Sequence, residues 1–209
     1  IEGLSSGALI KNNEVTSEVV GMSIGSPQSG PSNVPAGIQI IGNKVLASVL
    51  AIQVNNVADV IIDGNVVFGK TNTDSVQTAT GIRLNGGYLS GTIQNNEITS
   101  DYYGIISDAG GPTPAAPSNL LIKKNTIHES FEAIRVNRAT ENIIIEKNTV
   151  NSIANQGTEQ PTGIIVTTSS TGPITTNVQV TANTVTSQGY CIQINGASSS
   201  CAIIGSKII

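Results

Sequence analysis

The sequence predicts an all-β fold, a parallel solenoid of about seven to eight coils that forms one domain over residues 1–209. Three observations predict it. Two short phrases alternate along the chain, both have the period-two alternation of half-buried strands, and the distance between them is nearly constant. Aromatic residues make up only 3% of the chain and Trp is absent, so we expect a core of Ile, Val and Leu.

The first phrase reads apolar, x, Ile or Val, x, x, Asn, x, Ile or Val. Seven copies occupy residues 8–15, 38–45, 60–67, 91–98, 120–127, 143–150 and 178–185. A degenerate eighth copy at 201–208 has Ser206 in place of Asn. The alternation and the β-branched side chains are typical of strands with one buried face.

The second phrase reads small residue, Ile, x, Val, Leu or Ile, often followed by Asn. Clear copies lie at 51–55, 81–85, 133–137 and 191–195, with looser copies at 21–25, 104–108 and 163–167. Seven residues separate the last apolar residue of the first phrase from the Ile or Met of the second in five of seven cases. The minimal unit of 22 to 23 residues, with two or three short strands, is typical of one turn of a parallel solenoid.

One Asn recurs in each copy of the first phrase. We expect it to adopt the left-handed conformation at a sharp turn, which Asn tolerates at low cost. Stacked coils would then align the side-chain amides in a hydrogen-bonded ladder along the solenoid axis. The column comprises Asn13, Asn43, Asn65, Asn96, Asn125, Asn148 and Asn183.

With these phrases the chain resembles the right-handed parallel β-helix superfamily, the repeat seen in pectate lyase-like proteins, alginate epimerases, phage tailspikes and many surface proteins. The resemblance covers residues 8–208. It implies right-handed coils, a tight turn at the Asn column, and a carbohydrate groove lined by the GIRLN-like strands. It leaves the activity open, because the fold hosts many functions.

We expect no cofactor and no metal. The Asp-Pro-His-Asp signature of alginate epimerases is absent, and the acids are too dispersed for the ligand cluster of calcium-dependent lyases. One His and two Cys cannot form a zinc site. Cys191 and Cys201 could form a disulfide, but the inward position of Cys201 in its phrase favours free, buried thiols.

The net charge of −4, without a Lys/Arg block, argues against nucleic acid as a partner. No apolar stretch approaches a spanning helix, so we expect no membrane insertion. The chain starts without Met or a signal peptide, so we expect a processed product or part of a longer chain. The resemblance to surface proteins and phage tailspikes implies a location outside the cell, at the cell surface or on a virion. Flanking domains or a homo-oligomer, such as a trimer, would cover the solenoid ends.

Long insertions flank the second phrase on both sides and predict a groove. They lie at 26–37, 109–119 and 168–177 after it, and at 69–80 and 151–162 before it. The outward position of each second-phrase strand would form the groove floor. This row comprises Ser23, Gln53, Arg83, Ile106, Arg135, Ile165 and Gln193.

Most of the side chains that could act as acids or bases, or bind a charged or polar ligand, fall on three successive coils of this groove. The candidate catalytic residues are Asp101, Asp108 and Glu132. The candidate substrate-binding residues are Arg83, Tyr103, Arg135 and His128. Carboxylates on adjacent coils suit acid and base roles at a glycosidic bond, with Glu132 as base or nucleophile and Asp101 as proton donor. In the competing interpretation, Arg and Glu only pair across coils and His128 is an ordinary surface residue.

We therefore expect the groove to bind a polysaccharide or cell-surface glycan, and to cleave it if the protein is an enzyme, as a hydrolase or a lyase. The scarcity of aromatic side chains speaks against a sugar site, because such sites usually stack a ring against the sugar. The alternative function is a non-catalytic shaft, spacer or adhesin domain of a surface or tail protein. The sequence leaves open whether the protein is an enzyme.

Overall fold

The computed structural model describes residues 6–25, 34–70, 79–86, 90–108, 118–139, 141–153, 160–168, 176–196 and 201–209. Within these ranges every regular element is a strand, and the structure contains no apolar helix of membrane-spanning length. The strands form three parallel sheets, of eight, eight and seven strands, confirming the predicted all-β class.

Each of the first seven coils contributes one strand to each sheet, in a fixed order, and β22 and β23 add an eighth strand to sheets 1 and 2. Sheet 1 contains β1 (Leu9–Lys11), β4 (Gln39–Ile41), β7 (Val60–Asp63), β10 (Gly91–Gln94), β13 (Ser118–Lys123), β16 (Glu141–Glu146), β19 (Thr176–Thr181) and β22 (Cys201–Ile204). Sheet 2 contains β2 (Glu14–Ser17), β5 (Lys44–Ala47), β8 (Val66–Gly69), β11 (Glu97–Ser100), β14 (Thr126–Ser130), β17 (Thr149–Ser152), β20 (Thr184–Ser187) and β23 (Lys207–Ile208). Sheet 3 contains β3 (Val20–Gly25), β6 (Leu50–Asn55), β9 (Thr80–Asn85), β12 (Tyr103–Asp108), β15 (Glu132–Ala139), β18 (Thr162–Thr168) and β21 (Tyr190–Asn195).

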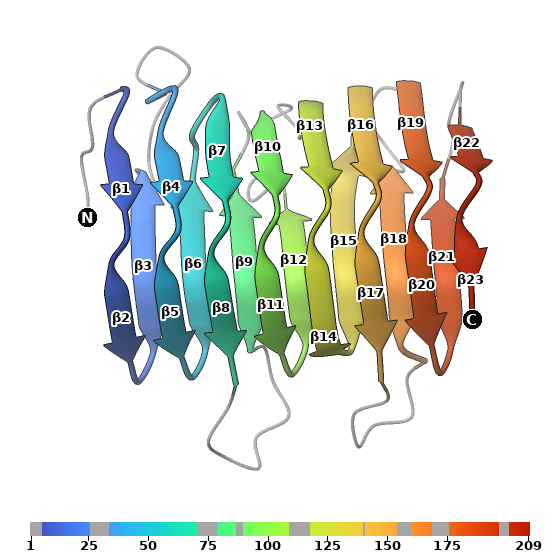
Figure 1. Cartoon of the computed structure of the whole chain (residues 1–209). Coiled ribbons are helices and arrows are strands. Elements are labelled where there is room, and N and C mark those ends of the chain that lie inside the picture. Colours follow the sequence, from blue (N-terminus) through green and yellow to red (C-terminus); the bar gives the residue numbers. More distant parts are fainter. Residues whose placement is uncertain are drawn as a thin grey trace.

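The coils stack side by side into a right-handed parallel β-helix (Figure 1). In Figure 1 the chain runs down through sheets 1 and 2 at the front and returns upward through sheet 3 at the back, one coil further along the axis. The two termini lie at opposite ends of the stack. Sheet 3 therefore presents one continuous outer face built from the second phrase of every coil.

Inward side chains of equivalent strands stack in apolar columns that run the length of the core. In sheet 1 one column comprises Ile10, Ile40, Ile62, Ile93, Ile122, Ile145, Val180 and Ile203. Its members are fully buried in the inner coils, from Ile40 to Val180. This confirms the expected core of Ile, Val and Leu, and the β-branched residues fit the column because their χ1 angles are already restricted.

The Asn ladder is present and buried. In each coil the backbone nitrogen and Nδ2 of the column Asn both donate to the side-chain oxygen of the next, as from Asn96 to Asn125 at 3.0 and 2.9 Å. The same Nδ2 also donates to a backbone carbonyl of the preceding coil, that of Ile62 in this case, at 2.9 Å. At the bend, some backbone N–H and C=O groups have no partner within sheet 1 or sheet 2. Each Asn side chain supplies hydrogen bonds to these groups.

The left-handed residue is not the column Asn, and that expectation was wrong. The positive φ angles fall one position earlier, at Asn95 (55°), Lys124 (54°) and Lys147 (56°) among others. The left-handed residue makes the bend, and the following Asn turns its amide inward to hydrogen-bond. The first phrase consequently spans two strands joined at this bend, one in sheet 1 and one in sheet 2, rather than one strand.

Cys191 and Cys201 are both free, and Cys201 is not buried as expected. Cys201 does occupy an inward register position, opposite Val178. It is exposed because β22 belongs to the last coil, so no further coil covers it. Partial burial still raises the pKa of its thiol.

Candidate functional site

The outer face of sheet 3 carries the predicted row of outward side chains in register. Pairing along the sheet aligns Ser23, Gln53, Arg83, Ile106, Arg135, Ile165 and Gln193. The period-two alternation of the second phrase therefore identified this row correctly. Two further rows flank it. One lies three residues before this position and the other two residues after it, and both align from coil to coil.

The first flanking row passes through Tyr103 and Glu132, which pair between β12 and β15. The second passes through Asn55, Asn85 and Asp108 on β6, β9 and β12. Within it Nδ2 of Asn85 donates to Oδ1 of Asn55 at 3.2 Å. The three rows together form the surface over the middle coils of sheet 3, called the sheet 3 face below. It is mostly polar, but its central row also contains Ile106 and Ile165, which are only 5% and 7% exposed.

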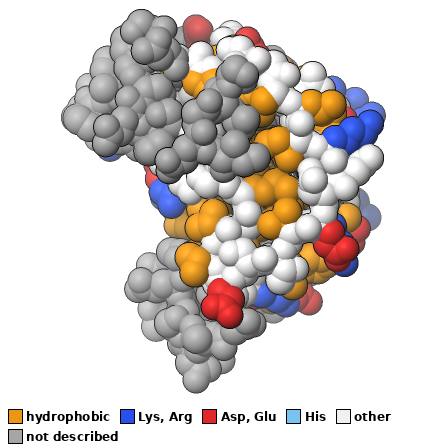
Figure 2. Space-filling model, turned by 90° about the vertical axis from the view of Figure 1, so that its left-hand side faces the viewer, with side chains coloured by type: hydrophobic (Ala, Val, Ile, Leu, Met, Phe, Trp, Pro, Cys, Tyr) orange, Lys and Arg blue, Asp and Glu red, His pale blue; other side chains and the backbone are white. Residues whose placement is uncertain are grey.

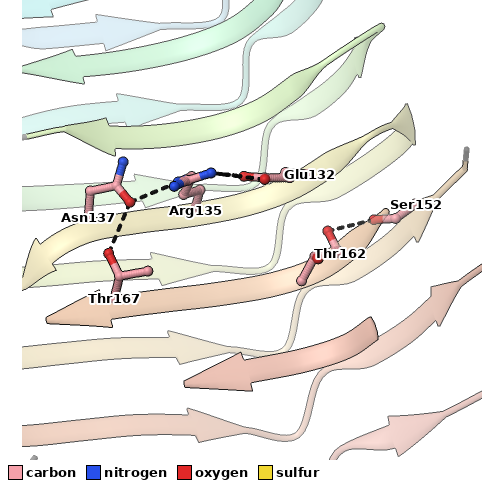
Figure 3. A network of polar contacts seen from close by, with 6 residues as sticks. All are labelled: Glu132, Arg135, Asn137, Ser152, Thr162 and Thr167. Carbon is pink, nitrogen blue, oxygen red and sulfur yellow. Dashed lines mark hydrogen bonds and ion pairs between the residues drawn. The ribbon is translucent and has the colours of Figure 1, made fainter. Parts of the chain in front are cut away.

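Arg135 is held between Glu132 and Asn137 on this face (Figure 3). Its Nη1 donates to both carboxylate oxygens of Glu132, at 2.9 and 2.8 Å, and its Nε donates to Oδ1 of Asn137 at 2.8 Å. Oγ1 of Thr167 on β18 donates to the same Asn137 oxygen at 3.0 Å. This network fixes the guanidinium and links two coils.

Burial and charge act in opposite directions on Arg135. Burial disfavours the charged guanidinium, but the charge and hydrogen bonds of Glu132 outweigh it, so the pKa of Arg135 is raised. The side chains of Arg135 and Glu132 are 27% and 11% exposed, so the pair is largely withdrawn from solvent. The ion pair lies within one strand, three residues apart, and not across coils as the competing interpretation expected.

Arg83 is held more loosely. Its Nη2 lies 3.7 Å from Oδ2 of Asp108 on the next coil, a distance that allows charge attraction but not a hydrogen bond. Its Nε is buried and has no hydrogen-bond partner. Arg83 therefore has unused donor capacity on this face.

Three aromatic rings meet at the corner where sheet 2 turns into sheet 3. The Tyr102 ring lies edge-on to Tyr103, with centroids 4.5 Å apart, and 5.0 Å from the ring of Phe131. Burial and the negative charge of Glu132 raise the pKa of Tyr103 to about 12. The hydroxyl of Tyr103 therefore stays protonated at neutral pH and can donate a hydrogen bond.

The structure brings five of the seven candidate residues onto the sheet 3 face and places two elsewhere. The five on the face are Arg83, Tyr103, Asp108, Glu132 and Arg135. Asp101 lies at the corner after β11, where its charge acts on Lys70. His128 lies on β14 in sheet 2, and its Nε2 is 3.8 Å from Glu97 on the neighbouring strand.

The two candidate carboxylates on the face are far apart along the strands. Glu132 pairs with Tyr103, and Asp108 follows Tyr103 by five positions, which corresponds to about 16 Å in an extended strand. Carboxylate pairs in glycosidases stand roughly 5 to 9.5 Å apart. The spacing of Asp108 and Glu132 thus suits two separate contacts with a ligand better than one catalytic pair.

Asn137, Thr167, Asn55 and Asn85 belong to the polar surface but were not among the predicted site residues. A signal was available, because Asn closes the phrases GIRLN and AIRVN. The insertions expected to form the groove walls lie mostly outside the described residues, so the structure describes the floor. Within the described part of the chain, no three His, Cys, Asp or Glu side chains gather as metal ligands.

Stacked coils of three short parallel strands, joined by an internal Asn ladder, place the chain in the class of parallel β-solenoids. Residues 5–208 match the family described as the right handed beta helix region, and the chain belongs to this family. No curated protein and no solved structure matches the chain.

Proposed function

We propose that the sheet 3 face binds a segment of a polysaccharide or cell-surface glycan, outside the cell, at the cell surface or on a virion. One observation carries this proposal: the Arg83 side chain is 39% exposed and its guanidinium makes no hydrogen bond to the described residues. Its accessible N–H groups can donate to a ligand oxygen without breaking an existing hydrogen bond. Arg135 offers fewer free donors, because its Nε and Nη1 already donate to Asn137 and Glu132.

The surroundings of Arg83 suit a sugar. Asp108 and Asn85 supply hydrogen-bond acceptors and donors on neighbouring positions of the same face. Tyr103 adds a partly exposed ring and a protonated hydroxyl one coil away from Arg83. A sugar presents several hydroxyls around a partly apolar ring, and this combination of polar rows and one aromatic side chain complements it.

Cleavage is a second function that a specific contact favours. The backbone N–H of Glu132 donates to the carbonyl of Tyr102 at 2.8 Å, and Tyr102 directly follows Asp101. Asp101 and Glu132 thus belong to adjacent coils at the same corner, where two carboxylates could attack and protonate a glycosidic bond. The tight ion pair of Glu132 with Arg135 favours instead a structural role, as in a shaft, spacer or adhesin domain.

The test is glycan-array binding with the whole chain and two variants. Arg83→Met should weaken binding by about tenfold or more, because it removes a guanidinium of this face that makes no hydrogen bond to the described residues. Lys147→Met is the matched control, since it removes one positive charge from an exposed bend on another side of the solenoid. Equal loss in both variants would mean that only net charge matters.

A degradation assay on the bound polysaccharides separates binding from catalysis. If the protein cleaves, Glu132→Gln should abolish product release while binding is kept. If no glycan binds and no polysaccharide is degraded, the sheet 3 face is only a solvated surface, and the spacer function stands in place of the proposal.

A further inference from the structure

Arg83 and Asp108 lie beside each other on the sheet 3 face without a hydrogen bond between them. Nη2 of Arg83 is 3.7 Å from Oδ2 of Asp108, and the two side chains are 39% and 34% exposed. A guanidinium only donates hydrogen bonds, and an ionised carboxylate only accepts them. The pair therefore offers a ligand one donor and one acceptor at neighbouring positions.

A hydroxyl group complements such a pair. Its oxygen can accept a hydrogen bond from Arg83 while its hydrogen is donated to Asp108, and two adjacent hydroxyls of one sugar ring can divide the same roles. A carboxylate cannot do both, because it only accepts hydrogen bonds, and it would also set a second negative charge beside Asp108. The chemistry of the pair thus favours an uncharged sugar over an acidic one.

The charges of the sheet 3 face balance one another. Among the described members of its three rows, two side chains are positive and two are negative. Arg83 lies beside Asp108, and Nη1 of Arg135 donates to both carboxylate oxygens of its partner Glu132. Burial lowers the pKa of Arg135, but the charges of Glu132 and Asp108 help to raise it, so Asp108 acts on both guanidinium groups. The face therefore has no excess positive charge that would attract an acidic chain.

Uncharged side chains surround these two pairs. Asn55 and Asn85 continue the row of Asp108, and Ile106 lies between the two arginines in the central row. Seen along the solenoid axis, Asp, Glu, Lys and Arg side chains lie around the rim and hydrophobic side chains lie across the middle (Figure 2). The outward rows alone thus set the charge that a ligand meets on a sheet face, and on this face most of their members are neutral.

From this arrangement we propose that the sheet 3 face selects neutral glycans over acidic ones, with Asp108 as the specificity-determining residue. The inference rests on the proposed glycan binding and adds the chemical class of the glycan. Arg83 donates to a sugar hydroxyl, and Asp108 accepts from the same hydroxyl or from its neighbour on the ring. A uronic acid in this position meets the like charge of Asp108, which is unfavourable at close range.

Isothermal titration calorimetry with the whole chain tests the proposal. The probes are gluco-, galacto- and manno-oligosaccharides and their uronic-acid counterparts, matched in length and linkage. At least one neutral series should bind about tenfold or more tightly than its acidic counterpart. Raising the salt concentration should leave the affinity for that neutral series nearly unchanged, because screening acts on interactions between charges.

Two variants separate the role of Asp108 from an effect of net charge. Asp108→Asn keeps the size of the side chain and removes its charge, so the preference for the neutral series should shrink by about tenfold as the acidic series binds better. Glu146→Gln, on the outward side of β16 in sheet 1, removes one negative charge elsewhere and should leave the preference unchanged. Circular dichroism establishes that both variants are folded.

Equal or tighter binding of the acidic series by the unmodified chain would overturn this inference and leave the proposed glycan binding in place, and this comparison depends on no variant. The inference would also be wrong if Asp108→Asn kept the preference of the unmodified chain, or if both variants changed it equally. Binding of none of the oligosaccharides would contradict the inference and the proposed function together.

Discussion

The side-chain oxygen of Asn125 accepts two hydrogen bonds from Asn96, one from the backbone nitrogen at 3.0 Å and one from Nδ2 at 2.9 Å. The same contact repeats along the solenoid, and it links every coil to the next at the bend between sheets 1 and 2. The register of the sheet 3 face depends on this link, because each coil can contribute its outward side chains in line only if the bends are in line.

Replacing Asn125 by Ala should destabilise the protein strongly. The change leaves the buried backbone nitrogen of Asn96 and the carbonyl of Ile93 without the partners they have now. Two such groups cost about 2 to 5 kcal/mol together. Urea unfolding measures the loss, and the control Asn151→Ala, on an exposed position of β17, should change stability by less than about 0.5 kcal/mol. Similar losses in the two variants would contradict a structural role for the ladder.

Truncating Ile122 to Ala should open a cavity in the core column between Ile93 and Ile145. We expect a loss of about 2 to 5 kcal/mol in the free energy of unfolding. Leu121→Ala, on the outward side of the same strand, should cost clearly less, because Leu121 is only partly buried. A loss below about 0.5 kcal/mol at Ile122 would place this column outside the core.

Ser107→Ala should raise the free energy of unfolding, in contrast to the two substitutions above. The hydroxyl of Ser107 is buried without a hydrogen-bond partner, in register with Leu84 and Val136. Removing an unsatisfied hydroxyl at nearly constant volume should raise stability by about 1 kcal/mol. Thermal unfolding measures the gain, and a fall in melting temperature would show that the hydroxyl has a partner in solution.

Ionisation of Tyr103 should lower the free energy of unfolding at alkaline pH. Its pKa is about 12 in the folded chain against about 10 for an unfolded tyrosine, so the folded state holds the proton more tightly. The corresponding stability is present below about pH 10 and is lost as the pH rises toward 12. An ultraviolet titration should show a tyrosine step near pH 12 that disappears in Tyr103→Phe. A titration with the same steps in both chains would contradict the shift.

The fold could be predicted because its signals repeat in every coil. Inward columns such as that of Ile93, Ile122 and Ile145 give the same period in each copy, and the constant spacing fixes the order of the strands. The left-handed position also carried a signal in the sequence, but one that the prediction missed. Five of its eight residues are Gly or Asn, the types that tolerate a positive φ, and the other three weaken the signal. They are Asn12, Gly42, Gly64, Asn95 and Gly205, against Lys124, Lys147 and Ala182.

The candidate site was predictable for its outward rows but not for its contacts. Arg83 and Arg135 were placed correctly by alternation, whereas strict alternation would put Glu132, three residues before Arg135 on the same strand, on the opposite side, and the structure pairs the two. A register shift between Ile127 and Ser130, where Glu129 has a φ of 56°, locally alters the pairing of β14 beside His128. Such irregularities depend on three-dimensional packing and produce no repeating pattern in the sequence.

The most direct test of the central claim is the NMR signal of the arginine Nε–H groups during titration with oligosaccharides. The chain has three arginines, and Arg83→Lys assigns the resonance of interest. Uronic-acid and neutral gluco-oligosaccharides serve as the two classes of probe. If the sheet 3 face binds glycan, the Arg83 signal should shift in proportion to occupancy, whereas that of Arg135, already bonded to Asn137, should move much less. Oligosaccharide binding that leaves the Arg83 signal in place would contradict the account.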